Sequence, residues 1–206
     1  MTWNELLKSL SVRWAIVFCL LSLLIVIFYL PHFYGHVIEP KSGVYLNDIF
    51  LNLFTPFNWS VLIFSMIYIS ILQTIFSVAR RPYFIVLGLT TYFAVTLIRM
   101  GTMYLVTLEP PVDMIFLTDP LSTKFYPNGT FAKDMFFSGH VSTMMVLVLI
   151  EKNKWARRVK IGFTFAIGVL LAWQHVHYTI DILVAPLVTS VVFYSLKNIL
   201  GPAIKD

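Results

Sequence analysis

The sequence predicts an all-α membrane protein, folded as a single bundle of six transmembrane helices. Of its 206 residues, 58% are hydrophobic and only 12% are charged, and the mean hydropathy is +0.81. A soluble domain of this size needs a polar exterior and is ordinarily about 25% charged. The composition therefore excludes a soluble enzyme, a disordered tail and a nucleic-acid-binding module. The length suits one integral membrane domain over residues 1–206.

Six stretches without charged residues are the candidate membrane spans. A spanning helix needs about 17–25 residues, so only the first two stretches suffice alone and the other four must extend into neighbouring sequence. The third is expected to continue through Arg99 to about Val106, and the sixth to begin near Tyr178 and include Asp181. None alternates apolar and polar residues as a barrel strand would. The stretches are Trp14–Leu30, Trp59–Ala79, Tyr83–Ile98, Met135–Ile150, Ile161–Gln174 and Ile182–Leu196.

The net charge of +5 encodes orientation in this interpretation. Eleven of the fifteen Lys and Arg residues fall before the first stretch, between the second and third, between the fourth and fifth, or after the sixth. Cytoplasmic loops of membrane proteins carry such an excess, so we expect both termini to be cytoplasmic. Segments 31–58, 107–134 and 175–181 are then expected to face outward. The protein is expected in a plasma or inner membrane with its active site on the outer (periplasmic or exoplasmic) side.

Ionisable residues at membrane depth are costly, and they mark functional sites. All five histidines fall on the predicted outer side, and one of them, His140, ends the stretch Asp134–His140 that opens the fourth helix. Gly139 permits close backbone approach there, and the unsatisfied N–H groups of a helix N-terminus can bind an anion. This stretch is therefore a candidate anion site with an imidazole at its mouth.

A second candidate stretch, His175–Asp181, enters the sixth helix. His177 and Asp181 are four residues apart and share a helix face, so the carboxylate can hold one imidazole nitrogen protonated and leave the other free. Because the fourth and fifth helices form a hairpin, His140 is expected at a similar depth. Two alternatives are a buried His–Asp pair that only staples helices and a zinc site, which needs three or four ligands. The roles of His175, His32 and His36 stay open, the last two being expected in the lipid headgroup region.

Two histidines and a carboxylate predict phosphoryl-group transfer through a phosphohistidine. One histidine attacks phosphorus while the other protonates the departing alcohol and then deprotonates the next acceptor. This chemistry requires no metal and no cofactor.

Three motifs resemble the sphingomyelin synthase branch of the type 2 phosphatidic acid phosphatase (PAP2) superfamily. They are Ser138-Gly139-His140, the stretch His177–Asp181, and the segment 99–111 at the end of the third helix. Asp134 also matches an acid that the family places four residues before the serine. The resemblance covers about residues 95–190. It departs at Ala132-Lys133, where eukaryotic synthases tend to have Cys-Gly, and at Pro186, where they carry an aromatic residue.

The resemblance implies a six-helix enzyme in which His177 is the nucleophile, Asp181 orients it and His140 is the acid–base. The implied reaction moves a phosphocholine or phosphoethanolamine head group from a glycerophospholipid to ceramide, to another lipid alcohol or to water, and releases diacylglycerol. The expected partners are therefore a phospholipid donor, a ceramide-like acceptor and the membrane, without nucleic acid; a homo-oligomer is left open.

The basic residues that distinguish lipid phosphatases of this superfamily are missing. Those enzymes have a Lys-x6-Arg-Pro element and an Arg six residues before the second histidine, where this chain has Thr74 and Leu171. A phosphomonoester carries nearly two negative charges and needs a cationic cradle, whereas Arg99 is the one obvious cation at the right depth. A singly charged phosphodiester is the better match. Outer acids, among them Asp113 and Asp119, are candidates to accommodate a choline or ethanolamine cation. The predicted substrate-binding residues are Arg99, Asp134, Ser138, Gly139, Tyr178 and Glu109.

Two other functions remain as alternatives. One is a PAP2-type lipid phosphatase that acts on phosphate monoesters or pyrophosphates. The other is a non-enzymatic small transporter or assembly subunit in which His and Asp relay protons.

Overall fold

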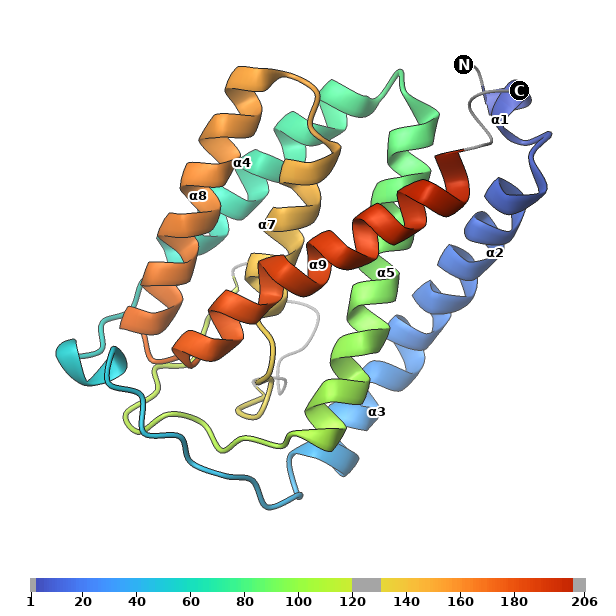
Figure 1. Cartoon of the computed structure of the whole chain (residues 1–206). Coiled ribbons are helices and arrows are strands. Elements are labelled where there is room, and N and C mark those ends of the chain that lie inside the picture. Colours follow the sequence, from blue (N-terminus) through green and yellow to red (C-terminus); the bar gives the residue numbers. More distant parts are fainter. Residues whose placement is uncertain (1–2, 120–130, 202–206) are drawn as a thin grey trace.

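The computed structural model describes residues 3–119 and 131–201, and within them the chain is helical, with one isolated β-bridge and no strand (Figure 1). The long helices pack side by side as one bundle. The elements are α1 (Trp3–Leu6), α2 (Leu10–Leu24), η1 (Ile25–Tyr29), α3 (Leu30–Phe33), η2 (Tyr34–Ile38), η3 (Leu51–Leu53), α4 (Ser60–Val78), α5 (Pro82–Leu105), α7 (Gly139–Ile150), α8 (Lys154–Trp173) and α9 (Thr179–Leu200).

The first span is longer than predicted. It runs as a continuous helix from Leu10 to Ile38, so the expected end of the first helix at Leu30 was wrong, and residues 31–38 of the predicted outer segment are helical. Pro31 does not end the helix because it closely follows the π-helical turn η1, in which Leu30 N donates to Ile25 O and the wider turn accommodates the proline. His32 and His36 consequently stand one helical turn apart on an exposed helix face, with ring centroids 4.5 Å apart.

Four helical spans are long and apolar enough to cross a membrane: Leu10–Ile38, α4, α5 and α9. α7 is apolar but has only 12 residues and rises about 18 Å. α8 is long, but Arg157, Arg158 and Lys160 lie in its first two turns. The long apolar helices fit a membrane protein, while the six-span count and the cytoplasmic termini stay predictions.

Helix α7 is central to the bundle because it contacts α4, α5, α8 and α9. Its buried residues Val141 and Met144 join the largest apolar core, which also contains Ile63, Ile167 and Ala185 of the three neighbouring helices α4, α8 and α9. A second core, which includes Leu6 and Leu200, lies where α1 and the end of α9 come together. The described chain therefore begins and ends at the same end of the bundle (Figure 1).

The connecting segments that were predicted to face outward gather at the opposite end of the bundle (Figure 1). Segments 39–59 and 106–118 are joined by a bridge in which Val44 N donates to Thr107 O and Glu109 N donates to Val44 O. Hydrogen bonds between loops of different spans fix this end as an ordered cap, and the two candidate stretches of the sequence lie within it.

Candidate active site

His177 and Asp181 form a buried pair at the start of α9. Their side chains are 1% and 0% exposed, and Nδ1 of His177 lies 3.4 Å from Oδ2 of Asp181. The same Oδ2 accepts a hydrogen bond from the backbone N–H of Tyr178, so the carboxylate also caps the helix. The backbone oxygen of Asp181 accepts from Ser138 N at 3.1 Å, which ties α9 to the start of α7. The pair leaves Nε2 of His177 without a hydrogen bond among the described residues.

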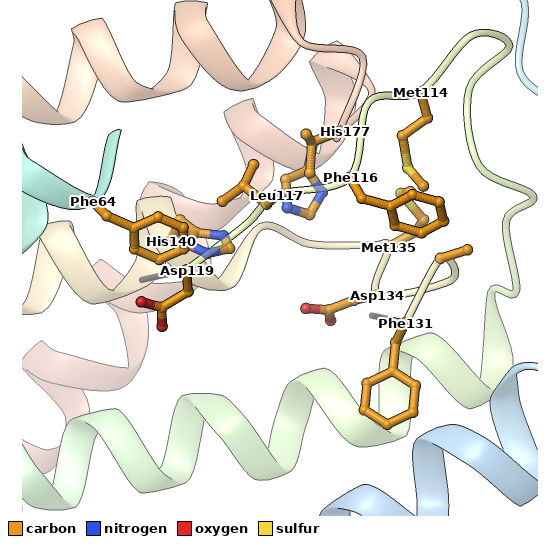
Figure 2. Close-up of a pocket in the computed structure, with 12 residues that line it drawn as sticks. Phe64, Met114, Phe116, Leu117, Asp119, Phe131, Asp134, Met135, His140 and His177 are labelled. Atoms are coloured by element: carbon orange, nitrogen blue, oxygen red, sulfur yellow. The ribbon is translucent and has the colours of Figure 1, made fainter. Parts of the chain in front are cut away.

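His140 faces this pair from the second residue of α7. Its ring centroid is 6.3 Å from that of His177, in an edge-on arrangement, and 5.7 Å from the ring of Phe64 (Figure 2). Its Nδ1 is buried without a hydrogen-bond partner among the described residues. The two imidazoles are too far apart to bond directly, and the gap between them suits a tetrahedral phosphoryl group.

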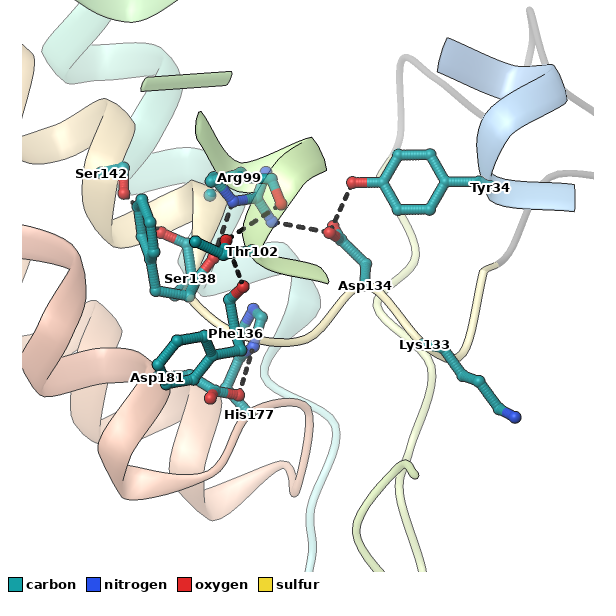
Figure 3. Close-up of polar contacts among 12 residues, drawn as sticks. Tyr34, Arg99, Thr102, Lys133, Asp134, Phe136, Ser138, Ser142, His177 and Asp181 are labelled. Carbon is teal, nitrogen blue, oxygen red and sulfur yellow. Dashed lines mark hydrogen bonds and ion pairs between the residues drawn. The ribbon is translucent and has the colours of Figure 1, made fainter. Parts of the chain in front are cut away.

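Arg99 braces the segment that leads into α7. Its Nε donates to Phe137 O at 2.7 Å and its Nη2 pairs with Asp134 at 2.6 Å, while Tyr34 donates to the same carboxylate at 2.6 Å (Figure 3). Burial by itself raises the pKa of Asp134. The Arg99 guanidinium and the hydrogen bond from the Tyr34 hydroxyl lower it by more than burial raises it, so the net pKa is below the ordinary value. Asp134 is therefore a carboxylate at the edge of the site.

Gly139 and Ser138 shape the site by packing and capping. A Cβ at position 139 would lie 2.5 Å from Nη1 of Arg99, so only glycine admits the guanidinium here. Ser138 is the N-cap of α7: its hydroxyl accepts from Val141 N at 3.4 Å, and its carbonyl accepts from Ser142. Gly139 thus makes room for Arg99, and Ser138 caps α7.

Two cavities meet at His140. The first, of about 210 Å³, lies under the outer segments, with Phe116, Phe131 and His177 in its wall (Figure 2). The second, of about 400 Å³, continues into the bundle between the segment η1–η2 of the first span, α4, α5 and α7. Both are bordered by four residues: Phe64, Asp119, Asp134 and His140.

Besides Ser138, two predicted substrate-binding side chains line neither cavity. Glu109 accepts hydrogen bonds from Lys133 at 2.9 Å and from Gly43 N at 2.7 Å, and these bonds lower the pKa of its carboxyl below the ordinary value. The hydroxyl of Tyr178 donates to Glu109 O and accepts from Leu46 N. In this structure both residues fasten the outer cap together, and their contact with substrate stays a prediction.

Sequence reasoning gave no role to Gln174, which is fully buried at the end of α8. Its Oε1 accepts from Trp59 N at 2.7 Å, and its Nε2 donates to Ser60 Oγ and to Ile115 O at 3.1 Å. It thereby joins the start of α4 to the outer segment that walls the first cavity. The sequence signal was an amide at the end of an apolar stretch, directly before the histidine pair. Tyr34 was also missed, because it was placed in a loop rather than on the first helix.

Over residues 3–119 and 131–201, His, Cys, Asp and Glu form no group of three with the spacing of a metal site.

Fold and site together define a class: a helical membrane protein whose paired histidines, one of them held by a carboxylate, face each other across a cavity. Residues 133–199 match the family model described as PAP2 superfamily C-terminal. The match covers about a third of the chain and includes His140, His177 and Asp181; phosphatase or phosphotransferase chemistry is typical of that superfamily. A search of curated proteins found no match to the chain.

Proposed function

We propose that this protein is a membrane phosphotransferase that moves a phosphocholine- or phosphoethanolamine-type head group from a glycerophospholipid to a ceramide-like lipid alcohol, or to water. The observation that supports it most directly is the placement of His140 opposite the His177–Asp181 pair, with 6.3 Å between the ring centroids. A cavity opens at that point, and several long apolar helices give lipids access to it.

The proposed reaction has two steps. In the first, Nε2 of His177 attacks phosphorus, the bond from phosphorus to the diacylglycerol oxygen breaks, and protonated His140 gives its proton to that oxygen. In the second, the acceptor hydroxyl loses its proton to His140 while its oxygen attacks phosphorus, and the bond to His177 breaks. Asp181 keeps Nδ1 of His177 protonated and stabilises the positive charge that develops on the ring.

The charges around the cavities favour a zwitterionic phosphodiester. Among the described residues, Arg99 is the one Lys or Arg that lines either cavity, and its charge is already balanced by Asp134. A dianionic monoester would find no surplus positive charge there. Asp119 and Asp134 border the cavity beside the rings of Phe116 and Phe131, and a carboxylate with aromatic faces suits a quaternary or primary ammonium group.

The second cavity has the lining expected for an acyl chain. Below His140 it is walled by apolar side chains from three helices, among them Leu30, Ile67 and Val146. Val146 lies six residues along α7 from His140, about 9 Å deeper in the bundle. A lipid with its phosphate between the histidines could therefore place a chain in this cavity without leaving the membrane.

Mass spectrometry of the products tests the proposal. Purified protein in nanodiscs is incubated with a panel of phospholipids, with and without ceramide, and all products are identified. We expect diacylglycerol together with a new phosphocholine or phosphoethanolamine lipid, or the free phospho-alcohol when no acceptor is present. His140→Ala removes both the acid of the first step and the base of the second, so turnover should fall by orders of magnitude, and any labelled phospho-head group trapped on His177 in this variant would support the covalent step.

The match of residues 133–199 to a superfamily that is typically composed of phosphatases favours one second candidate, a phosphatase of lipid phosphate monoesters. It predicts release of inorganic phosphate from phosphatidate and no choline phosphate from phosphatidylcholine. A non-enzymatic transporter predicts no lipid turnover by the native protein. Either result would overturn the transferase assignment.

A further inference from the structure

His175 occupies an unusual position two residues before the proposed nucleophile. Its backbone is left-handed, with φ of 57°, and the residue is 8% exposed. Its ring nitrogens both face backbone carbonyls: Nδ1 lies 2.9 Å from Val112 O and Nε2 lies 3.1 Å from Leu51 O. One imidazole thus joins two outer segments that are far apart in sequence to the turn between α8 and α9.

The chemistry of these two contacts specifies the charge of the ring. A carbonyl oxygen only accepts hydrogen bonds, and a neutral imidazole has one N–H group, so it can satisfy only one of the two carbonyls. The doubly protonated imidazolium donates to both. Both hydrogen bonds can therefore form only when His175 carries a proton on each nitrogen.

The segment held at Val112 continues directly into the wall of the first cavity. Phe116, Leu117 and Asp119 of this segment line that cavity, and Ile115 N donates to Gln174 O at 3.2 Å. His175 and Gln174 are thus adjacent anchors for the same wall. If the His175 contact is lost, the segment is still held by Gln174 at Ile115, by Ser60 at Thr118 and by Tyr68 at Asp119, so the loosening should begin around Val112.

We propose that His175 is a positioning residue whose doubly protonated ring clamps segments 49–54 and 112–119 to the α8–α9 turn, so that loss of its proton loosens the wall of the His140–His177 cavity. The clamp itself is independent of the reaction. Its effect on turnover rests on the proposed function.

The groups that face this ring are acidic or neutral. His175 lines a cavity of about 280 Å³ together with two acids, Asp48 from the first outer segment and Asp113 from the second. The hydroxyl-bearing rings of Tyr45 and Tyr178 line it too. No Lys or Arg among the described residues lines this cavity.

Hydrogen exchange followed by mass spectrometry measures the clamp without requiring turnover. Protection of peptides that cover 49–54 and 112–117 is compared between about pH 5.5 and pH 8, the range in which histidine changes charge, after correction for intrinsic exchange rates. We expect protection in native protein to fall about tenfold or more as the pH rises, which corresponds to about 1.4 kcal/mol. In His175→Asn, protection should be low at both pH values.

Asparagine is the informative substitution because it tolerates a left-handed backbone and its short side chain cannot reach both carbonyls. His36→Asn, at an exposed histidine on the first helix, is the matched control and should keep the native pH response. His175→Gly, which adopts the left-handed backbone conformation without strain, should show the same low protection as His175→Asn. Protection that does not change with pH in native protein, or that His175→Asn retains, would overturn the clamp.

Steady-state kinetics test whether the clamp affects the proposed active site. At about pH 5.5, His175→Asn should raise KM for the lipid donor more than it lowers kcat, since the proposed nucleophile and acid–base are untouched. If the native protein has no lipid turnover but shows the expected exchange behaviour, the proposed function fails and the clamp stands. If turnover is present and the exchange is independent of pH, the clamp fails alone.

Discussion

Gly139 and the guanidinium of Arg99 pack against each other so closely that a Cβ on residue 139 would lie 2.5 Å from Nη1 and 2.9 Å from Cζ. Arg99 cannot simply move away, because Phe137 O and Asp134 hold it. The glycine of the Ser-Gly-His motif is thus required by an arginine 40 positions earlier in the chain. This contact couples the position of His140, the next residue, to helix α5.

Gly139→Ala should therefore lower activity strongly, although alanine is the better helix former. We expect turnover to fall about tenfold or more, because displacing Arg99 moves the start of α7 by fractions of an ångström and catalysis is sensitive to such shifts. Gly162→Ala in α8 is the control, since the Cβ that this substitution adds would have no neighbouring atom within 4 Å. The control should be neutral or stabilise the protein by about 0.5–1 kcal/mol. Equal activity of the two variants would contradict this role for Gly139.

Loss of charge at Asp181 should disable the proposed nucleophile without unfolding the protein. Asp181→Asn keeps the shape but offers no anion to Nδ1 of His177, and we expect kcat to fall about 10³-fold or more, as in other catalytic His–Asp pairs. Adding His177→Ala to this variant should cost little more, because members of a catalytic unit act together. Ser190→Ala, further along α9, serves as the control for folding and should keep native turnover. Near-native kcat in Asp181→Asn would remove the catalytic assignment.

The Arg99–Asp134 pair should control the charge of the substrate that is accepted. Asp134→Asn leaves Arg99 with an unbalanced positive charge, so the site should favour a dianionic monoester over a zwitterionic diester. We expect the ratio of kcat/KM for phosphatidate to kcat/KM for phosphatidylcholine to rise about tenfold or more, or about 1.4 kcal/mol. Tyr34→Phe keeps the carboxylate and should leave this ratio near the native value, although it removes one hydrogen bond. An unchanged ratio in Asp134→Asn would show that this pair does not select substrate.

A buried ion pair at the opposite end of the bundle should make stability depend on acid pH. The carboxylate of Glu151 is 0% exposed and pairs with Lys160 at 2.7 Å. Burial raises its pKa, but the hydrogen bonds from Lys160 and Ser77 outweigh burial and lower the pKa to about 2. This contribution is present above the ordinary pKa of about 4.3 and is lost as the pH falls toward 2. The thermal midpoint of native protein should thus decrease from about pH 5 to pH 3.

Two variants isolate that contribution to stability. Glu151→Gln should lose this part of the acid dependence and should be less stable at neutral pH by about 3–5 kcal/mol, because Lys160 is left buried without an anion. The double variant Glu151→Gln with Lys160→Met should recover much of that loss. Thermal unfolding in detergent, followed from pH 3 to 7, measures both effects. Identical pH profiles for native protein and Glu151→Gln would refute the prediction.

Much of the fold follows from local sequence, since long uncharged stretches can satisfy their backbone groups in a membrane only as helices. The predicted continuation of the third span through Arg99 was confirmed in α5, and Asp181 lies in the first turn of α9 as expected. Local sequence failed at Pro31, because whether a proline ends a helix depends on its place in a turn. It also failed at α7, which begins at Gly139 rather than near Met135, because Arg99 and Thr102 hold the carbonyls of residues 136 and 137.

The sequence by itself determined the class of the protein and the chemistry that its site can support. Hydropathy sets the helices, and the spacing of four between His177 and Asp181 puts their side chains within reach on one helix turn. Only the tertiary structure decided which of the remaining candidates meet. Arg99 pairs with Asp134, Asp119 lines the same cavity as His140, and Glu109 and Tyr178 form hydrogen bonds within the outer cap. The reason is physical: a contact within one helix turn follows from backbone geometry, whereas contacts between loops depend on how several helices pack.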